Sequence, residues 1–214
     1  MIKTNNKGQL IVISGPSGVG KGVICNEILK VRKKIWLSIS VTTREPRKNE
    51  VEGKNYYYIT KEKFEEKIKK HEFLEYAKVF NDDYYGTPKD KVIEKLNNGI
   101  DVILEIDING ALQINNTYND AVFIFIMPPS IKELFNRIYT RSTESKDKII
   151  ERFKRAYKEI NEVSKYNYVV VNDNINKALE KVNSIIIAQK CRVDRIDEVY
   201  LNTIEEFIHE NLID

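Results

Sequence analysis

The residues with the clearest chemical meaning form a glycine-rich loop that ends in a lysine. The segment Gly15-Pro16-Ser17-Gly18-Val19-Gly20-Lys21 fits the pattern G-x-x-x-x-G-K, and Gly22 follows it. Glycines let backbone N–H groups surround phosphate oxygens, a following helix adds partial positive charge, and the lysine reaches the β- and γ-phosphates. A strand-like apolar run precedes the segment and a helical pattern follows it. We therefore predict a phosphate-binding loop at residues 15–22.

The placement of the arginines is a second chemical signal. The chain has 35 basic and 32 acidic residues, and a net charge of +3 is too balanced to indicate a nucleic-acid-binding protein. Lysines outnumber arginines by 26 to 9, yet six arginines fall into two groups: Arg44 and Arg47, then Arg137, Arg141, Arg152 and Arg155. A guanidinium group binds phosphate oxygens in pairs, whereas an ammonium is a point charge. We expect both groups to bind phosphate; a solvated helix face is the alternative for the second.

Two acidic residues and one missing hydroxyl bear on metal binding. Glu105 and Asp107 stand at the carboxyl end of a predicted strand, the edge of an α/β sheet where ligands bind. A phosphate loop is usually followed by a Ser or Thr that contacts Mg²⁺, but Gly22 and Val23 follow this one. We expect no direct protein ligand and a Mg²⁺ held through water and nucleotide phosphates. A solvated strand end is the alternative for the two acids.

Apolar runs alternate with helical patterns along most of the chain, which predicts an α/β domain with a mainly parallel sheet. The predicted strands are Leu10–Ile13, Ile35–Val41, Val102–Ile106, Val122–Ile126 and Tyr168–Val171. The predicted helices cover residues 22–34, 89–98, 130–140, 146–165 and 175–190.

Local signals predict how two of these helices begin. Thr87 is expected to cap the helix that starts after Pro88. Ser130 and Glu133 are expected to form a capping box. In that second helix, the apolar positions predicted to be buried are Ile131, Leu134 and Ile138.

The pattern changes between Val41 and Thr87. That stretch has a polar segment, the strand-like Tyr56–Ile59, a short helix at residues 61–70 and the apolar Phe73–Val79. It is typical of a small α+β insertion between two strands of the main sheet. No apolar run approaches a membrane span and the first nine residues have no signal-peptide core, so we expect a cytoplasmic protein without a membrane partner.

Several motifs in this order resemble the guanylate kinase family. The match is carried by Ser38-Ile39-Ser40-Val41-Thr42-Thr43-Arg44-x-Pro46-Arg47-x-x-Glu50-x-x-Gly53-Lys54-x-Tyr56, Phe73-Leu74-Glu75-Tyr76-Ala77, Tyr84-Tyr85-Gly86-Thr87-Pro88, Leu104-Glu105-Ile106-Asp107 and Asn172-Asp173. It runs from about Gln9 to Gln189. The resemblance implies a P-loop NTPase core with an inserted α+β region that binds the nucleoside monophosphate and a helical lid.

The resemblance also implies the division of the chain. The core would cover about 9–40, 88–130 and 156–190, the GMP-binding insertion about 41–87 and the lid about 131–155, with a C-terminal helical extension at about 191–214. All four parts belong to one guanylate-kinase-like domain. We expect it to act as a monomer or a homodimer, with ATP and GMP as its small-molecule substrates.

Carried over by position, the resemblance implies an ATP-dependent phosphoryl transfer to GMP, and to dGMP, in purine metabolism and GMP recycling. Arg44, Arg47, Tyr56 and Tyr85 would hold the GMP phosphate. Glu75 and Asp107 would accept hydrogen bonds from the guanine edge, with Ser40 and Thr87 near its O6 atom and Glu105 as a further GMP-binding residue. Residues 15–22 would bind ATP with Mg²⁺. The catalytic charges would come from Lys21, Arg44, Arg137, Arg141 and Arg152.

Two other functions compete with the kinase. Guanylate-kinase-like domains of scaffold proteins bind phosphopeptides in the GMP groove, but they lack a working phosphate loop. A P-loop kinase for another nucleotide is the second alternative. Val23 departs from the Thr that these kinases generally have, and loss of that hydroxyl could lower turnover. Ser142 also departs, replacing the Gly that generally follows the lid arginine.

Overall fold

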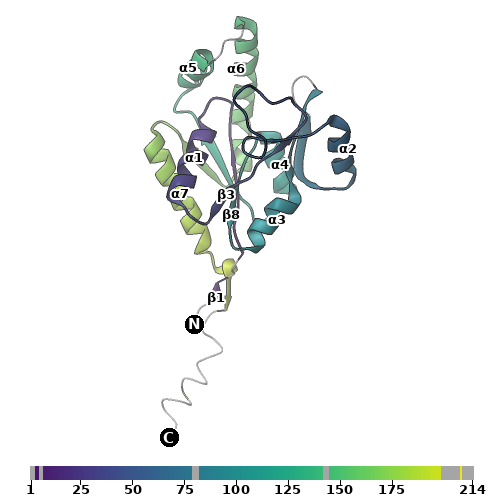
Figure 1. The fold of residues 1–214 in the computed structure, drawn as a ribbon. Coiled ribbons are helices and arrows are strands. Elements are labelled where there is room, and N and C mark those ends of the chain that lie inside the picture. Colours follow the sequence, from purple (N-terminus) through teal and green to yellow (C-terminus); the bar gives the residue numbers. More distant parts are fainter. Residues whose placement is uncertain (1–2, 5–6, 79–81, 142–144, 199–207, 209–214) are drawn as a thin grey trace.

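The computed structural model describes residues 3–4, 7–78, 82–141, 145–198 and 208. Its centre is a five-stranded parallel sheet with the order β10-β9-β2-β8-β3 (Figure 1). The strands are β2 (Leu10–Ser14), β3 (Ile35–Leu37), β8 (Asp101–Glu105), β9 (Val122–Met127) and β10 (Tyr168–Val171). The predicted parallel sheet is thus confirmed.

Helices cover both faces of this sheet (Figure 1). On one face α1 (Lys21–Val31) and α7 (Ile175–Lys190) pack on Ile11 and Ile13. On the other, α3 (Lys89–Asn97) and α4 (Ile108–Thr117) pack on Leu10 and Val12. Consecutive strand residues therefore enter opposite cores, which is why these strands read as continuous apolar runs. This two-sided core fixes the carboxyl edge of the sheet, where the phosphate loop begins.

A second, four-stranded sheet has the order β5-β4-β7-β6 and is formed by the segment predicted as an insertion. Its strands are β4 (Val41–Thr42), β5 (Tyr57–Tyr58), β6 (Phe73–Lys78) and β7 (Tyr84–Pro88), and α2 (Lys61–Lys69) packs on it. Phe64 of α2 is fully buried and stacks on Phe73 at 4.4 Å and Tyr84 at 5.1 Å between ring centroids. This small aromatic core holds the insertion together.

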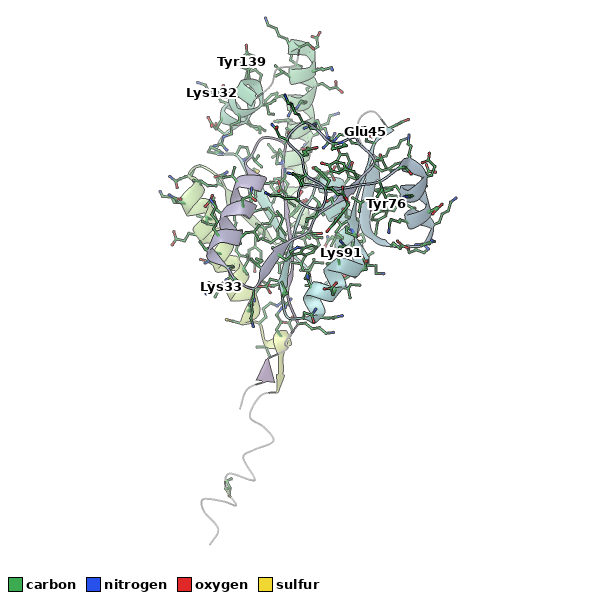
Figure 2. The ribbon with its side chains drawn as sticks, viewed as in Figure 1. Lys33, Glu45, Tyr76, Lys91, Lys132 and Tyr139 are labelled. Atoms are coloured by element: carbon green, nitrogen blue, oxygen red, sulfur yellow. The ribbon has the colours of Figure 1, made fainter. Side chains whose placement is uncertain are left out.

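The remaining helices form an arm that extends from the core (Figure 1). It consists of α5 (Ile131–Arg141) and α6 (Lys146–Ile160), with a 3₁₀ helix at Asn161–Lys165 after it. Phe135 of α5 meets Phe153 of α6 edge to face at 5.3 Å. At the outer end of α5, Tyr139 is exposed and points away from the body of the molecule (Figure 2). This arm corresponds to the predicted lid, with residues 142–144 outside the described part.

The described part of the C-terminal extension is not an α-helix. A 3₁₀ helix at Val193–Arg195 leads into β11 (Ile196–Glu198), which pairs antiparallel with β1 (Lys3–Thr4). The rest of the predicted extension lies outside the described residues, apart from the helical, exposed Ile208. No helix in the described part of the chain is long and apolar enough to span a membrane.

Three local predictions were wrong. The expected strand Ile35–Val41 is divided between β3 and β4, because the chain leaves the core sheet after Leu37 and enters the second sheet at Val41. Thr87 does not cap α3: Pro88 is the N-cap, and Thr87 lies in β7 with its hydroxyl bonded to Glu75. Ile131 is exposed, whereas Leu134 and Ile138 are buried as expected.

The predicted capping box of α5 is half formed. The Ser130 hydroxyl oxygen accepts from the Glu133 N–H at 3.1 Å. The Glu133 carboxylate, however, accepts from Arg137 Nε at 2.8 Å. An arginine one turn along the helix therefore takes the carboxylate that a full capping box would use.

Candidate active site

The phosphate loop joins the end of β2 to the start of α1, as the sequence predicts. Gly15 and Gly20 have φ angles of 140° and 94°, values that favour glycine. A Cβ atom at Gly15 would lie 2.3 Å from the carbonyl oxygen of Ile126, and one at Gly20 would lie 2.7 Å from Asn172 Nδ2. Both glycines are therefore needed for the loop to pass between β9, β10 and α1.

Lys21 lies inside this loop and close to Glu105. Its ammonium donates to the carbonyl oxygens of Gly15 at 2.5 Å and Pro16 at 3.1 Å. Burial lowers the pKa of Lys21, and the charge of Glu105 is the largest opposing effect. Burial raises the pKa of Glu105, which Lys21 in turn lowers. The lysine therefore sits where its charge is weakly solvated and available to a bound anion.

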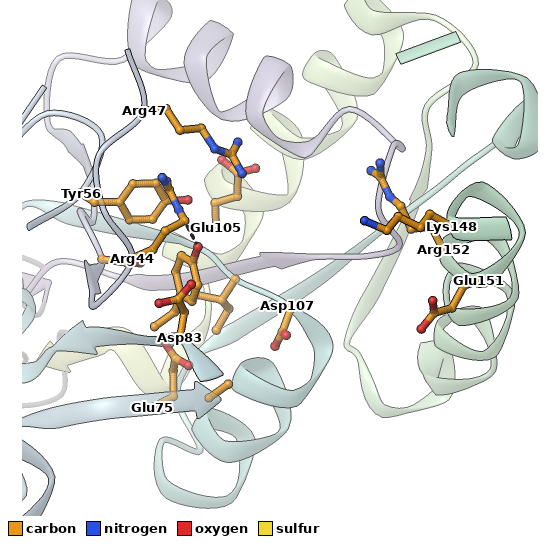
Figure 3. A pocket seen from close by; sticks show the side chains of 14 residues that line it. Arg44, Arg47, Tyr56, Glu75, Asp83, Glu105, Asp107, Lys148, Glu151 and Arg152 are labelled. Atoms are coloured by element: carbon orange, nitrogen blue, oxygen red, sulfur yellow. Dashed lines mark hydrogen bonds between the residues drawn. The ribbon is translucent and has the colours of Figure 1, made fainter. Parts of the chain in front are cut away.

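A cleft of about 670 Å³ opens between the core sheet, the insertion and α6 (Figure 3). Eight predicted site residues of the core and insertion line it: Ser40, Arg44, Arg47, Tyr56, Glu75, Tyr85, Glu105 and Asp107. From α6, Lys148, Glu151 and the predicted lid residue Arg152 face the same space from the opposite side. The structure thus brings together residues that are up to 112 positions apart, from Ser40 to Arg152.

One wall of the cleft combines arginines with tyrosines. Arg44 donates from Nε to the Tyr85 hydroxyl at 3.0 Å, and its guanidinium lies 5.5 Å from the ring centre of Tyr56. The rings of Tyr56 and Tyr85 meet edge to face at 5.6 Å. Arg47 lines the cleft beside them. Two cations with nearby phenol hydroxyls form a surface that suits a phosphate dianion.

Two carboxylates occupy the inner part of the cleft. Glu75 is 6% exposed, and its Oε1 accepts from the Thr87 hydroxyl at 2.6 Å. Burial raises the pKa of Glu75 to about 7. Asp107 caps α4, with Oδ1 accepting from the Gly110 N–H at 2.9 Å. Thr87 is therefore a buried support for Glu75 rather than a residue of the cleft lining, whereas both acids face the cleft.

The lid arginines occupy different places around the phosphate loop. Arg152 reaches from α6 to the Ser17 hydroxyl at 3.4 Å. Arg137 donates from Nη2 to the carbonyl oxygen of Asn172 at 3.1 Å. Asn172 in turn donates from Nδ2 to the carbonyl oxygen of Val19 at 2.8 Å. Two of the three predicted lid arginines are thus linked to the loop, while the side chain of Arg141 is outside the described part.

A family model described as guanylate kinase matches residues 7–189. The chain belongs to the guanylate kinase family. It is 60% identical to a guanylate kinase of Clostridium tetani, over 97% of this chain and 99% of that protein. A guanylate kinase of Clostridium acetobutylicum is 55% identical, over 98% of this chain and all of that protein. These matches confirm the family predicted from the motifs.

A solved structure also resembles the fold of this guanylate kinase family member. The crystal structure of guanylate kinase from Anaplasma phagocytophilum is 32% identical, with a TM-score of 0.75 over 99% of this chain and 97% of that one. The predicted α/β fold with its parallel sheet is therefore confirmed by a relative of the same family.

Sequence reasoning missed some residues that line the cleft of this family member. They are Ala77, Asp83, Ile106, Lys148 and Glu151. Ala77 and Ile106 lie inside motifs that were recognised, so the adjacent site residues could have indicated that they line the cleft. On the predicted helix Arg152 lies four positions after Lys148 and Glu151 lies three positions after it, and this helical spacing could have marked both Lys148 and Glu151 as neighbours on one face.

Among the residues that the structure describes, no group of three or more His, Cys, Asp or Glu side chains could hold a metal ion. Glu105 lies beside the loop, since a Cβ added at Gly22 would lie 3.3 Å from Glu105 Oε1. Val23 is 46% exposed and offers no oxygen. This donor set fits a hydrated Mg²⁺ that arrives with a nucleotide, because Mg²⁺ retains several waters.

Proposed function

We propose that this chain transfers the γ-phosphoryl group of ATP to GMP and releases ADP and GDP. The observation that carries the proposal is a cleft that combines the acids Glu75 and Asp107 with an arginine–tyrosine wall and that lies, on the far side of Glu105, beside a glycine-rich phosphate loop. A nucleoside monophosphate offers a base and one phosphate, and the acids and the wall match these groups. The loop matches the phosphates of the donor.

The acid pair supports a preference for guanine. Guanine presents two donors on one edge, N1–H and the 2-amino group, while adenine presents no matching pair. The carboxylates of Glu75 and Asp107 are acceptors that could receive them. Ser40 lies on the cleft wall and could approach O6, whereas Thr87 would act indirectly by holding Glu75 in place. An adenine in this position would leave the buried carboxylate of Glu75, and Asp107 beside it, without these donors, a strong basis for rejection.

The arginine–tyrosine wall would fix the acceptor phosphate. Arg44 and Arg47 supply charge, and Tyr56 and Tyr85 supply hydroxyl donors from the same wall. These contacts engage the base and the phosphate but not the ribose 2′-hydroxyl, so the same arrangement should accept dGMP. The acceptor would be held at both ends, which orients a phosphate oxygen toward the donor.

On the donor side, residues 15–22 would surround the ATP phosphates with backbone N–H groups, and Lys21 would move from its loop carbonyls to the β- and γ-oxygens. Arg137, Arg141 and Arg152 would approach from the lid. Phosphoryl transfer depends mainly on in-line positioning and on neutralising charge at the transferred group. Closure of the lid would also keep water away from that group.

When bound with ATP, Mg²⁺ would supply positive charge that neutralises part of the charge on the phosphates. The residue that would assist it is Glu105, through a water molecule. Lys21 remains the protein's own charge at the same phosphates. This assignment needs no direct protein ligand, in agreement with the side chains that the loop offers.

The proposal can be tested by measuring ADP formation with GMP, dGMP, AMP, UMP and CMP as acceptors under the same conditions. We expect turnover with GMP and dGMP, and a kcat/KM for AMP lower by about 10⁴-fold, because Glu75 and Asp107 would lack the two donors of the guanine edge. Similar kcat/KM values for AMP and GMP would refute the assignment of the base pocket.

A further inference from the structure

Glu50 is the centre of a hydrogen-bond network behind the arginine–tyrosine wall. Its two carboxylate oxygens each accept from Arg44 Nη2 at 2.9 Å. Oε2 also accepts from the Arg47 backbone N–H and from the Tyr58 hydroxyl, both at 2.9 Å. Glu50 is not among the described residues that line the cleft. It therefore touches the groups that would bind phosphate without facing the phosphate position itself.

This network fixes the guanidinium group of Arg44 from several directions. Besides its contacts with Glu50, Arg44 donates from Nε to Tyr85 at 3.0 Å and from Nη1 to the Glu45 carbonyl oxygen at 2.6 Å. Each of the three guanidinium nitrogens thus has its own partner, which defines the plane of the group as well as its position. An arginine with free rotamers would have to be ordered when the nucleotide binds, at a cost in affinity.

Glu50 holds Arg47 in a different way. The Arg47 N–H donates to the Glu50 carboxylate, while the Glu50 N–H donates to the Arg47 carbonyl oxygen, also at 2.9 Å. These reciprocal bonds close the turn formed by residues 47–50. The Arg47 side chain leaves this turn and enters the cleft. The position of its guanidinium thus depends on a turn that the Glu50 side chain closes.

The charge of Glu50 matters to both effects. The Arg47 N–H is the largest influence that lowers the pKa of Glu50 to about 2, and Arg44 and Tyr58 act in the same direction. Glu50 therefore remains ionised at neutral pH. Hydrogen bonds to an ionised acceptor are stronger than those to a neutral one, so an amide of the same shape would hold the arginines less firmly.

We propose that Glu50 is a positioning residue for the GMP phosphate, and that it orders Arg44 through their side chains and Arg47 through the turn. Tyr58 supports it by donating to the same carboxylate. The role rests on the proposed function, because it presumes that the two arginines receive the acceptor phosphate. The inference adds to that function a network of hydrogen bonds. In this network the half-buried Glu50 carboxylate, although negatively charged, improves the binding of an anion.

The test compares GMP with guanosine, which has the same base and no phosphate. We expect Glu50→Gln to raise the calorimetric Kd and the KM for GMP by about tenfold, as for a weakened charged hydrogen bond. The Kd for guanosine and the KM for ATP should stay within about twofold, because their contacts lie elsewhere. The matched control is Glu45→Gln, which removes an equal charge next to Arg44; the Glu45 side chain makes no ion pair or hydrogen bond with the described residues. It should leave the Kd for GMP within about twofold.

Two further variants keep the test decisive. In an Arg44→Met background, Glu50→Gln should have a smaller effect on the Kd for GMP than in the wild type, because one of its two targets is missing. Tyr58→Phe should raise this Kd by about two- to threefold, and it serves as the test if Glu50→Gln does not fold. An unchanged Kd for GMP in Glu50→Gln, or in Tyr58→Phe where that variant is the test, would overturn the inference.

An equal loss of GMP and guanosine binding would also overturn it, since that result indicates general damage to the insertion. These outcomes differ from failure of the proposed function. If the wild-type protein binds no GMP, the proposed function fails and the role of Glu50 fails with it. If the wild type binds GMP and the variants bind it equally well, only the role of Glu50 fails.

Discussion

The phosphate loop and the arginine–tyrosine wall are both suited to bind phosphate, but they are built from different parts of the chain. The loop is a continuous segment, residues 15–22, between a buried strand and the first turn of a helix. The wall combines Arg44, Arg47 and Tyr56, from the connection between β4 and β5, with Tyr85 of β7. The loop relies on backbone conformation, and the wall relies on side chains that hold one another.

This difference predicts how each region responds to substitution. In the loop, the essential requirement is room and backbone freedom at Gly15 and Gly20, together with one charge at Lys21. In the wall and the acid pair, Arg44 and Glu75 each have a protein partner that sets their position. Glu50 holds Arg44, and Thr87 holds Glu75. Changes on the acceptor side should therefore be graded and selective for the acceptor.

The largest expected effect belongs to the loop. Lys21→Met removes the charge that would meet the transferred phosphoryl group, and we expect kcat to fall by about 10²–10³-fold. Stopped-flow or coupled ADP assays at saturating GMP would measure it. The matched control is Lys30→Met, at an exposed position on the same helix that pairs with Glu27, and it should leave kcat within about twofold. A kcat for Lys21→Met close to that of the wild type would contradict a role for the loop lysine in phosphoryl transfer.

On the acceptor side, Glu75→Gln should reduce kcat/KM for GMP by about 10- to 100-fold through loss of a charged hydrogen bond to guanine. The KM for ATP should change little. Glu65→Gln is the matched control, because Glu65 is exposed on α2 of the same insertion. If the KM for ATP rose while the KM for GMP did not, the assignment of Glu75 to the acceptor pocket would be wrong.

The same substitution should have the opposite effect on stability. Burial raises the pKa of Glu75 to about 7 in the folded protein, above the ordinary value of 4.5. Between these two pH values the unfolded chain loses the proton first, so the wild type becomes less stable as the pH rises. We therefore expect Glu75→Gln to raise Tm at pH 8 and to lose that advantage toward pH 4.5. An advantage that did not vary with pH would contradict a raised pKa.

The smallest expected effect concerns Mg²⁺. Val23→Thr places a hydroxyl at a position that lacks one, and we expect half-maximal activity at a Mg²⁺ concentration lower by about fivefold, the value of one hydrogen bond. A magnesium titration at fixed total ATP would show this shift. Val51→Thr makes the same chemical change at an exposed site of the insertion and serves as the control. An identical magnesium dependence in Val23→Thr would mean that the missing hydroxyl has no consequence.

The comparison also explains what the sequence could predict. The loop could be predicted because its function depends on contiguous residues with fixed spacing. The buried parallel strands could be predicted because they are apolar runs. β7 was not predicted as a strand, because Gly86 and Pro88 oppose strand formation and only pairing with β4 and β6 stabilises it. The predictions for Thr87 as a cap and for Ile131 as a buried residue were wrong for the same reason. The orientation of both side chains is decided by tertiary contacts and not by local sequence signals.

The acceptor site was predictable mainly through its family resemblance. Composition and spacing alone marked Arg44 and Arg47, but nothing local placed Glu75 opposite Asp107 or brought Arg152 across the cleft. Helical spacing relates Lys148 and Glu151 to Arg152, but the cleft that all three line is completed by other elements of the fold. The same is true of the bonds from Glu50, which the motif contains without indicating what it contacts.

A crystal structure with GMP and a non-hydrolysable ATP analogue bound together would test the account most directly. We predict guanine N1 and N2 within hydrogen-bond distance of Glu75 and Asp107, the GMP phosphate against Arg44 and Arg47, and the triphosphate enclosed by residues 15–22. A GMP base bound away from both carboxylates, or a triphosphate outside the loop, would contradict it.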